Sequence, residues 1–185
     1  MVTTAPSGEL RKIFVVIDPK RLVQPALEKA EWLARRNGAE IELYCTLEPQ
    51  SVADSEAQAR LVARTQAWIE RIAEKPQSQG IKLSIRVEVN QNWRRAIAEA
   101  AARSDADLVI KTSSPRGVLR RRLMETADWT LLRNCAKPVL LASPSAPELP
   151  KTVLVAVKLK PEDKVYEELN RRVIALAHRI AGLLE

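Results

Sequence analysis

Histidine, cysteine and glycine are scarce in this 185-residue chain, and the shortage removes whole classes of function. The one histidine, His178, leaves no Ser-His or Cys-His pair for nucleophilic catalysis in the segment 12–142. The two cysteines, Cys45 and Cys135, cannot build a disulfide framework and do not have the spacing of metal ligands. Each lies in or beside an apolar segment, so we expect two buried free thiols and no bound metal. Because nucleophile-elbow, Walker A and zinc-protease motifs are missing too, we predict that the protein is not an enzyme.

Long apolar runs and a leader sequence are missing as well. The longest runs, such as IFVVI and VLVAV, are far too short to span a bilayer. The N-terminal stretch MVTTAPSGELRK has no apolar centre of the kind found in signal peptides. Five glycines against eleven prolines, with no compositional repeat, exclude collagen-like and low-complexity chains. We therefore expect a soluble, cytoplasmic protein that has no membrane partner.

Positive charge is in excess, with 30 lysines and arginines against 23 acidic residues and a net charge of +7. This excess favours acidic partners through long-range attraction. Aromatic residues make up only 4% of the chain, and few of them are interleaved with the basic residues, which are spread over several predicted helices. Nucleic-acid binding through Arg94, Arg95 and the arginines between 116 and 122 is therefore an alternative that ranks below protein partners.

Short apolar runs alternate with amphipathic helical patterns along most of the chain. Strands are predicted at 12–18, 40–47, 82–89, 107–112 and 138–142, and helices at 22–39, 52–74, 93–106 and 126–135. Strands that alternate with helices of this length indicate parallel β-α-β crossovers, hence an α/β fold with a doubly wound, five-stranded parallel sheet. The longest helix is expected to turn Leu61, Thr65, Trp68 and Ile72 inward and to be bounded by Pro76 and Gly80.

A similar strand-to-helix unit starts again near the C-terminus. The pattern VLVAVKLK followed by LNRRVIALAHR repeats IFVVIDPK followed by ALEKAEWLARR, which suggests a tandem protein cut early in its second domain. We divide the chain into an N-terminal arm (1–11), a complete domain (12–142), a linker (143–151) and the first strand and helix of an incomplete second domain (152–185). The strand of this last part is expected to seek an external partner.

Three stretches resemble the universal stress protein family: IFVVID at the first strand, ADLVIK with the later RGVLRRRLMETADWTLLRNCAKPVLLA, and the restart that follows Pro150. ADWTLLRNCAKPVLL is especially similar to the tandem E-type members of that family. The resemblance implies the family's doubly wound fold, of the adenine nucleotide alpha hydrolase-like type, and a role in stress response. It also implies pairing of sheet edges, either in a homodimer or in a tandem pseudo-dimer within one chain.

Nucleotide-binding members of the family carry the motif G-x-x-G-x9-G-[ST] after the fourth strand. In this chain Thr112, Pro115 and Glu125 stand at the three glycine positions, and Thr126 stands at the Ser/Thr position. Proline has no N–H, the other two side chains crowd a ligand that would lie against the backbone, and a glutamate brings negative charge to a helix N-terminus. We therefore expect a degenerate loop that disfavours ATP in the usual pose, and we predict no cofactor.

Five residues are candidate nucleotide or anion contacts: Asp18, Thr46, Thr112, Arg116 and Thr126. The resemblance places Asp18 at the acidic position that contacts the nucleoside, and Thr46 where the family's backbone contacts adenine. The alternative for Asp18 is a strand-end or helix-capping carboxylate. Lys158 stands at the equivalent of Asp18 in the second unit, which makes that unit less suited to a nucleotide.

The remaining candidates follow the fourth strand. Arg116, together with Arg120, Arg121 and Arg122, can bind phosphate or an acidic partner through forked hydrogen bonds, or can form a solvated loop paired with Glu125 and Asp128. Thr126 is either a phosphate contact or the N-cap of the helix at 126–135.

Taken together, the residues and the resemblance predict a non-enzymatic stress-response protein that acts through protein partners, as yet unknown, and through dimerisation. The alternatives are a stress-response switch that binds ATP or another nucleotide through an atypical loop and, ranked below it, a nucleic-acid-binding protein.

Overall fold

The structure of the protein is a computed structural model that describes residues 10–49, 55–114, 126–145, 152–158 and 162–182. The chain divides into two units, one over Glu9–Pro147 and one that contains the C-terminal residues from Glu148 onward. Each unit is described by itself below. Of the sequence-based candidates, Arg116 and its neighbouring arginines, Pro115 and Glu125 lie outside the described residues.

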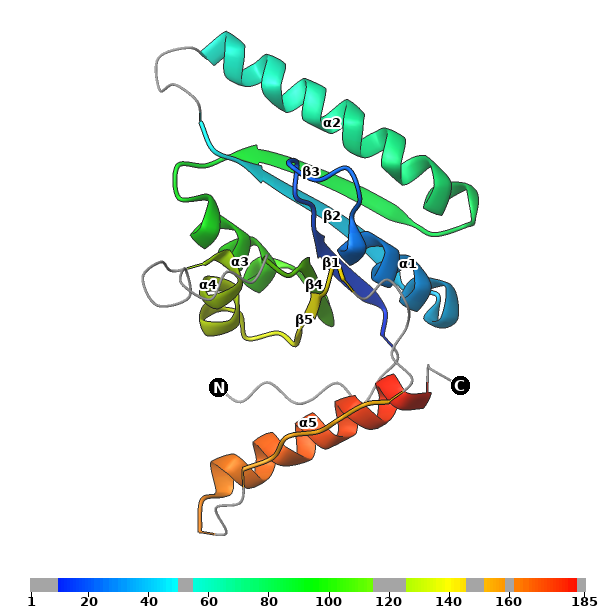
Figure 1. Cartoon of the computed structure of the whole chain (residues 1–185), viewed down its shortest axis with the longest axis vertical. Coiled ribbons are helices and arrows are strands. Elements are labelled where there is room, and N and C mark those ends of the chain that lie inside the picture. The colour runs from blue at the N-terminus through cyan, green and yellow to red at the C-terminus, as the bar shows by residue number, and fades with distance from the viewer. Residues whose placement is uncertain (1–9, 50–54, 115–125, 146–151, 159–161, 183–185) are drawn as a thin grey trace. The chain divides into compact units, whose positions relative to one another are not determined.

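The first unit is built on a five-stranded parallel sheet (Figure 1). Its strands are β1 (Lys12–Val16), β2 (Glu40–Leu47), β3 (Leu83–Val89), β4 (Leu108–Thr112) and β5 (Val139–Ala142). Their spatial order is β3-β2-β1-β4-β5, and every neighbouring pair is parallel. The predicted doubly wound, five-stranded sheet is therefore confirmed, and β1 lies in its centre, where the strand is buried on both faces.

Helices cover both faces of this sheet (Figure 1). The helices α1 (Pro25–Asn37) and α2 (Ser55–Ser78) lie on one side, and α3 (Trp93–Arg103) and α4 (Ala127–Asn134) on the other. On the second side, Phe14, Val16 and Val109 of the sheet pack with Ile97 of α3 and Leu131 of α4 in one hydrophobic cluster. The alternation of strands with helices on both faces follows from right-handed crossovers between parallel strands.

Helix α2 differs from its sequence-based prediction in two respects. Pro76 was expected to bound the helix, but it lies inside it and is buried; the helix continues to Ser78, and Gly80 follows with a φ of +84°. Proline has no N–H to bond to the carbonyl four residues earlier, so the helix lacks one backbone hydrogen bond at Pro76 and still continues for two more residues. The buried residues of the helix are Thr65, Ile69, Ala73 and Pro76, so among the four residues that we predicted only Thr65 is buried.

The second unit contains the helix α5 (Lys164–Gly182), as the sequence predicts. The predicted strand is wrong for its described residues, because 152–158 have no regular secondary structure. A strand requires backbone hydrogen bonds with a neighbouring strand, and the described part of this unit offers one helix and no strand. Instead, the amide of Asn170 on α5 donates to the carbonyl of Lys158 at 2.8 Å and accepts from its N–H at 3.2 Å. The division into 143–151 and 152–185 stays a prediction.

The two cysteines are free thiols, as predicted, but they differ in burial. Cys45 on β2 is fully buried, and burial together with the charge of Asp18 raises the pKa of its thiol to about 12. Cys135, which follows α4, is only half-buried, so the predicted burial holds for Cys45 alone. Among the described helices, none has both the length and the apolar character that are needed to cross a membrane.

Glu31 is a buried carboxyl on the inner side of α1, with 8% of the residue exposed. Burial raises its pKa above the ordinary value, and the positive charges of Lys75 and Arg35 oppose this rise without cancelling it. The native state therefore holds more protons than the unfolded chain in the window just above the ordinary pKa of about 4.5. Across that window the free energy of unfolding falls as the pH rises.

We predict that Glu31→Gln removes this fall in the free energy of unfolding with rising pH. Urea unfolding should show the variant gaining stability relative to wild type as the pH rises from about 4 to about 7. Glu28→Gln, which removes an exposed carboxylate from the first turn of the same helix, is the control and should slightly destabilise the protein at neutral pH. A Glu31→Gln variant that loses stability relative to wild type over this pH range would contradict a raised pKa of Glu31.

Candidate functional site

The candidate site lies where β1 and β4 end side by side. These two strands are parallel neighbours, with Val16 of β1 opposite Lys111 of β4. Their carboxyl ends therefore meet at one edge of the sheet, which is the edge where ligands bind in open parallel sheets. Asp18 follows β1 and Thr112 ends β4, so the structure brings these two predicted residues to the same edge. Thr46 lies near the end of β2, the neighbour of β1 on its other side.

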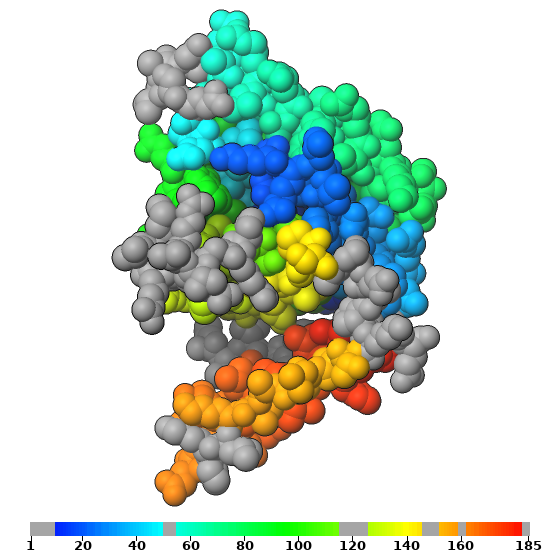
Figure 2. Space-filling model, viewed as in Figure 1, coloured from blue at the N-terminus to red at the C-terminus, as the bar shows by residue number. Residues whose placement is uncertain are grey.

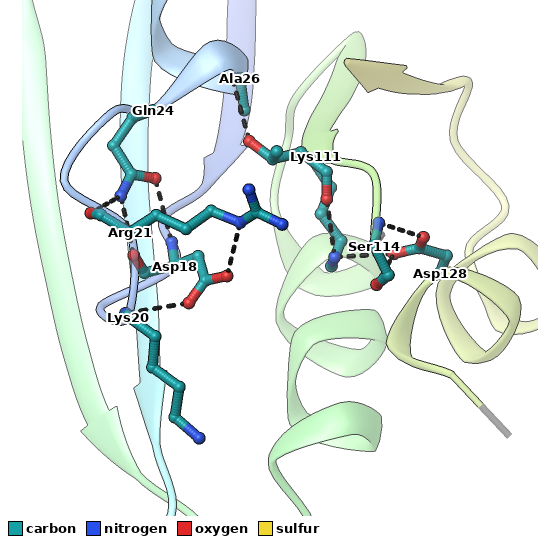
Figure 3. Close-up of polar contacts among 9 residues, drawn as sticks. Asp18, Lys20, Arg21, Gln24, Ala26, Lys111, Ser114 and Asp128 are labelled. Carbon is teal, nitrogen blue, oxygen red and sulfur yellow. Dashed lines mark hydrogen bonds and ion pairs between the residues drawn. The ribbon is translucent and has the colours of Figure 1, made fainter. Parts of the chain in front are cut away.

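The loop from Asp18 to Gln24 bonds to itself (Figure 3). The Asp18 carboxylate accepts hydrogen bonds from the backbone N–H of Lys20 at 3.0 Å and from Nε of Arg21 at 3.1 Å. The buried side-chain amide of Gln24 donates to the backbone carbonyls of Asp18 and Arg21, both at 2.7 Å, and accepts from the N–H of Asp18 at 3.2 Å. The acidic group that the sequence offered for a nucleoside thus holds its own loop in shape.

Thr112, at the first of the former glycine positions, is almost fully buried, with 3% of the residue exposed. Its hydroxyl oxygen accepts a hydrogen bond from the backbone N–H of Ala26 at 3.2 Å. Ala26 lies in the first turn of α1, where N–H groups have no partner inside the helix. A glycine could not provide this bond, so the side chain of Thr112 joins the end of β4 to the start of α1.

A carboxylate occupies the N-terminal end of α4, and it belongs to Asp128. Lys111 donates to Oδ1 of Asp128 at 2.7 Å, and the backbone N–H of Ser114 donates to Oδ2 at 2.8 Å (Figure 3). The Ser114 hydroxyl also lies 3.2 Å from Oδ1. The side chains of Lys111 and Asp128 are only 12% and 14% exposed. Since Asp128 also lies in the first turn of α4, the helix dipole favours its negative charge there.

This contact gives Asp128 the place at the start of the helix that the sequence analysis considered for Glu125, a residue that lies outside the described part of the chain. In the sequence, Asp128 was considered only as a partner of the loop arginines. Lys111 was the residue in the sequence that could have indicated an acidic partner at this place. It is a cation inside an otherwise apolar strand, and a buried cation requires an anionic neighbour.

Thr126 is the N-cap of α4, which confirms one of the two readings of this residue. Its backbone is extended, with a φ of −84° and a ψ of 156°, and its hydroxyl oxygen accepts from the N–H of Trp129 at 3.4 Å. Its carbonyl accepts from the N–H of Thr130 at 3.0 Å, which is the first hydrogen bond of the helix. Thr46 is buried, with 8% of the residue exposed, and its hydroxyl has no hydrogen-bond partner among the described residues.

The polar groups of the site are therefore largely bonded to one another. The carboxylates of Asp18 and Asp128 each have a cationic partner, and Thr112 and Asp128 accept backbone N–H groups near two helix starts. Within the described ranges, no three carboxyl, imidazole or thiol groups come together in a way that could hold a metal ion. Chemically, the arrangement resembles an anion site whose donors are taken by the protein's own side chains.

Known proteins are similar to this chain in sequence and in fold. The model of the universal stress protein family matches residues 9–143. Universal stress protein E of Photorhabdus laumondii subsp. laumondii is 27% identical over 183 residues, covering 93% of this chain and 58% of the relative. The chain thus spans little more than half of that relative's length.

Two solved structures show the shared fold. A protein from Pseudomonas aeruginosa UCBPP-PA14 superposes with a TM-score of 0.66 at 23% identity, over 95% of this chain and 58% of that one. The universal stress protein from Archaeoglobus fulgidus, solved in complex with dAMP, superposes with a TM-score of 0.52 at 18% identity, over 71% of this chain and 96% of that one.

The cap at Thr126 gives a direct test of the local geometry. Thr126→Ala removes the oxygen that accepts from the Trp129 N–H and should lower the free energy of unfolding by about 1 kcal/mol. Thr126→Ser, Thr126→Asp and Thr126→Asn retain an acceptor and should lose less. Thermal and urea unfolding of this series measures the effect, and an alanine variant as stable as wild type would rule out a stabilising cap.

Proposed function

Because this chain belongs to the universal stress protein family, we propose that it is a non-enzymatic stress-response protein that acts by binding protein partners. We further propose that its first unit does not take up ATP in the pose that the family's motif serves. The observation that carries the second part is the bonding of Asp18, Thr112 and Asp128 within the protein.

Entry of a nucleotide would have to break these bonds. The Asp18 carboxylate would exchange its bonds with Arg21 and the Lys20 N–H for bonds to a nucleoside. A phosphate near the Ser114 N–H would meet the Asp128 carboxylate, which already accepts from that N–H and neutralises Lys111. Hydrogen bonds to charged groups contribute roughly 1.5–3 kcal/mol each, so the nucleotide must repay a substantial cost before it gains affinity.

The A. fulgidus relative, solved with dAMP, supports the alternative, a nucleotide-binding switch. The likeness between that protein and this chain is one of fold. In this chain the same edge of the sheet carries a threonine, Thr112, at the first glycine position of the motif, and its hydroxyl is bonded to α1. We therefore rank partner binding above nucleotide binding. Nucleic-acid binding ranks third, because aromatic residues make up only 4% of the chain and offer few platforms on which bases could stack.

The absence of enzymatic activity is proposed on the chemistry of the described residues. The one histidine, His178, lies on α5 in the second unit, and in the described part of the first unit no imidazole stands beside a serine, threonine or cysteine. Cys45 is buried and its thiol has a raised pKa, which leaves little thiolate for nucleophilic attack. We propose the cytoplasm as its location.

Self-association is part of the proposal. Strand β5 pairs with β4 on one side and ends the sheet on the other, and its residues Val139, Leu140 and Leu141 are half-buried. In the second unit, α5 has no buried residue, and Leu169 and Ile174 are 50% and 52% exposed. We propose that these surfaces are covered in a homodimer or by the remainder of a tandem chain.

Calorimetry tests the nucleotide part. We expect no heat of binding when the full chain is titrated with ATP at millimolar concentration. The A. fulgidus protein titrated with dAMP is the positive control. Binding of ATP to the wild-type chain that is abolished by Asp18→Ala would overturn this proposal and establish the nucleotide switch.

Light scattering tests self-association. At about 100 μM, a range in which exposed apolar interfaces of moderate affinity are occupied, the chain should have a mass above the 20.7 kDa of one copy. Leu169→Lys combined with Ile174→Lys should lower the mass, whereas the charge-exchange control Glu167→Lys with Arg171→Glu should not. A strict monomer at all concentrations would contradict self-association.

A further inference from the structure

A shallow groove runs along α2 beside the loop that follows β1, and the proposed function does not yet account for it. Its volume is about 800 Å³, and its lining residues are Pro19, Leu61, Arg64, Thr65, Ala67, Trp68 and Arg71. We call this surface the α2 groove. It is open to solvent, and Figure 2 shows α2 (teal to green) and the loop after β1 (blue) on the same face of the molecule.

The groove exists because of the way α2 is rotated on the sheet. The helix buries Thr65, Ile69 and Ala73, and this places Leu61 and Trp68 on its flank. Both side chains are only half-buried. The helix therefore presents a leucine and a tryptophan along a groove that Pro19 also lines. A tryptophan in such a position is the kind of residue that contributes most to protein–protein binding energy.

Two arginines of α2 flank the tryptophan. Arg64 and Arg71 are exposed, and neither forms an ion pair or a side-chain hydrogen bond with a described residue. By contrast, Arg60 on the same helix pairs with Glu56. A rise of 1.5 Å per residue places Arg64 and Arg71 about 10 Å apart along the helix axis, with Trp68 between them.

The neighbouring loop is held in a fixed shape and displays aliphatic side chains. Leu22 and Val23 are 92% and 63% exposed, which is unusual for two adjacent large aliphatic residues. Their backbone is braced by the hydrogen bonds of Asp18 and Gln24 on either side. The same loop contributes Pro19 to the groove. The loop thus adds exposed apolar surface next to the groove at little cost in conformational entropy.

We propose that the α2 groove binds an amphipathic helix of a partner protein, one that carries two acidic residues about two turns apart with aliphatic residues between them. Such carboxylates match the spacing of Arg64 and Arg71, and arginine binds carboxylates through two parallel hydrogen bonds. The aliphatic residues cover Leu61 and Trp68 in the manner of a helix bound in a groove. This inference specifies the partner class of the proposed function and does not depend on whether the first unit binds ATP.

A helical peptide is favoured over a nucleic acid by the composition of the surface. Base stacking requires a series of aromatic platforms, and the groove contains a single tryptophan beside Leu61 and Pro19. A carboxylate-bearing helix satisfies both arginines and also buries the aliphatic surface, whereas a phosphate backbone would satisfy the arginines alone.

The test uses the full chain and a phage library of helical peptides, about five turns long, in which charged and apolar positions are randomised. The peptides enriched on the wild-type chain should carry Asp or Glu two turns apart around Leu, Ile or Met. The most enriched peptide is then synthesised with a fluorescent label, and its affinity is measured by anisotropy. Enrichment of basic peptides, or no enrichment above an empty-surface control, would overturn the proposal.

A charge-exchange experiment provides a second test of the proposal. Arg64→Glu combined with Arg71→Glu should weaken the acidic peptide at least about tenfold, and the same peptide with lysine at its two acidic positions should regain affinity for this variant. Arg95→Glu combined with Arg103→Glu on α3 makes the same change in net charge and should leave the affinity within about twofold of wild type. Circular dichroism confirms that both variants are folded.

Either of two results would contradict the inference. One is an equal loss of affinity in the α3 control, which would show that only net charge matters. The other is binding of a single-stranded oligonucleotide that is lost in the Arg64→Glu, Arg71→Glu variant, which would assign the surface to nucleic acid. If no peptide binds and calorimetry shows no heat with ATP, the α2 groove is excluded but partner binding through another surface is not. If ATP binds and the charge-exchange result is still obtained, the proposed function is contradicted while this inference holds.

Discussion

The parallel pairing of β1 with β4 is the constraint on which the rest of the first unit depends. It brings together two chain segments about 95 residues apart, so the loop after β1 and the end of β4 share one edge of the sheet. The bond from Ala26 to Thr112, which joins the start of α1 to β4, exists only because of this pairing. The backbone N–H groups of Arg11 and Lys12 also bond to Asp107, just before β4, which secures the opposite edge.

At the carboxyl edge the protein satisfies its own polar groups. A glycine-rich loop leaves backbone N–H groups free for a phosphate, whereas here the Asp128 carboxylate accepts the N–H of Ser114 and compensates the charge of Lys111. These hydrogen bonds of Asp128 join the end of β4 to the start of α4. The loop that Asp18 braces also displays Leu22 and Val23 to solvent.

The outcomes for particular residues show what local patterns can predict. The N-cap at Thr126 could be predicted from the sequence because a cap depends on the residue itself and on the N–H groups within the next turn. The inner face of α2 was misjudged, since several apolar stripes were compatible with its sequence and only contact with β3 selects one. Pro76 was expected to bound the helix because it lacks the N–H for a backbone bond, but burial of its ring holds it inside the last turn. The strand expected at 152–158 lacks a partner strand in the described residues, and no local pattern supplies one.

The amino-acid sequence alone determined the alternation of strands and helices, and with it the five-stranded parallel sheet and the burial of Cys45, because hydrophobic periodicity and burial are local properties of the chain. Only the tertiary structure decided which carboxylate pairs with Lys111, which oxygen receives the Ala26 N–H, and how α2 is rotated so that Trp68 lines a groove together with Arg64 and Arg71. These features depend on distances between residues far apart in the sequence, and such distances are set by the packing of the whole sheet with its helices.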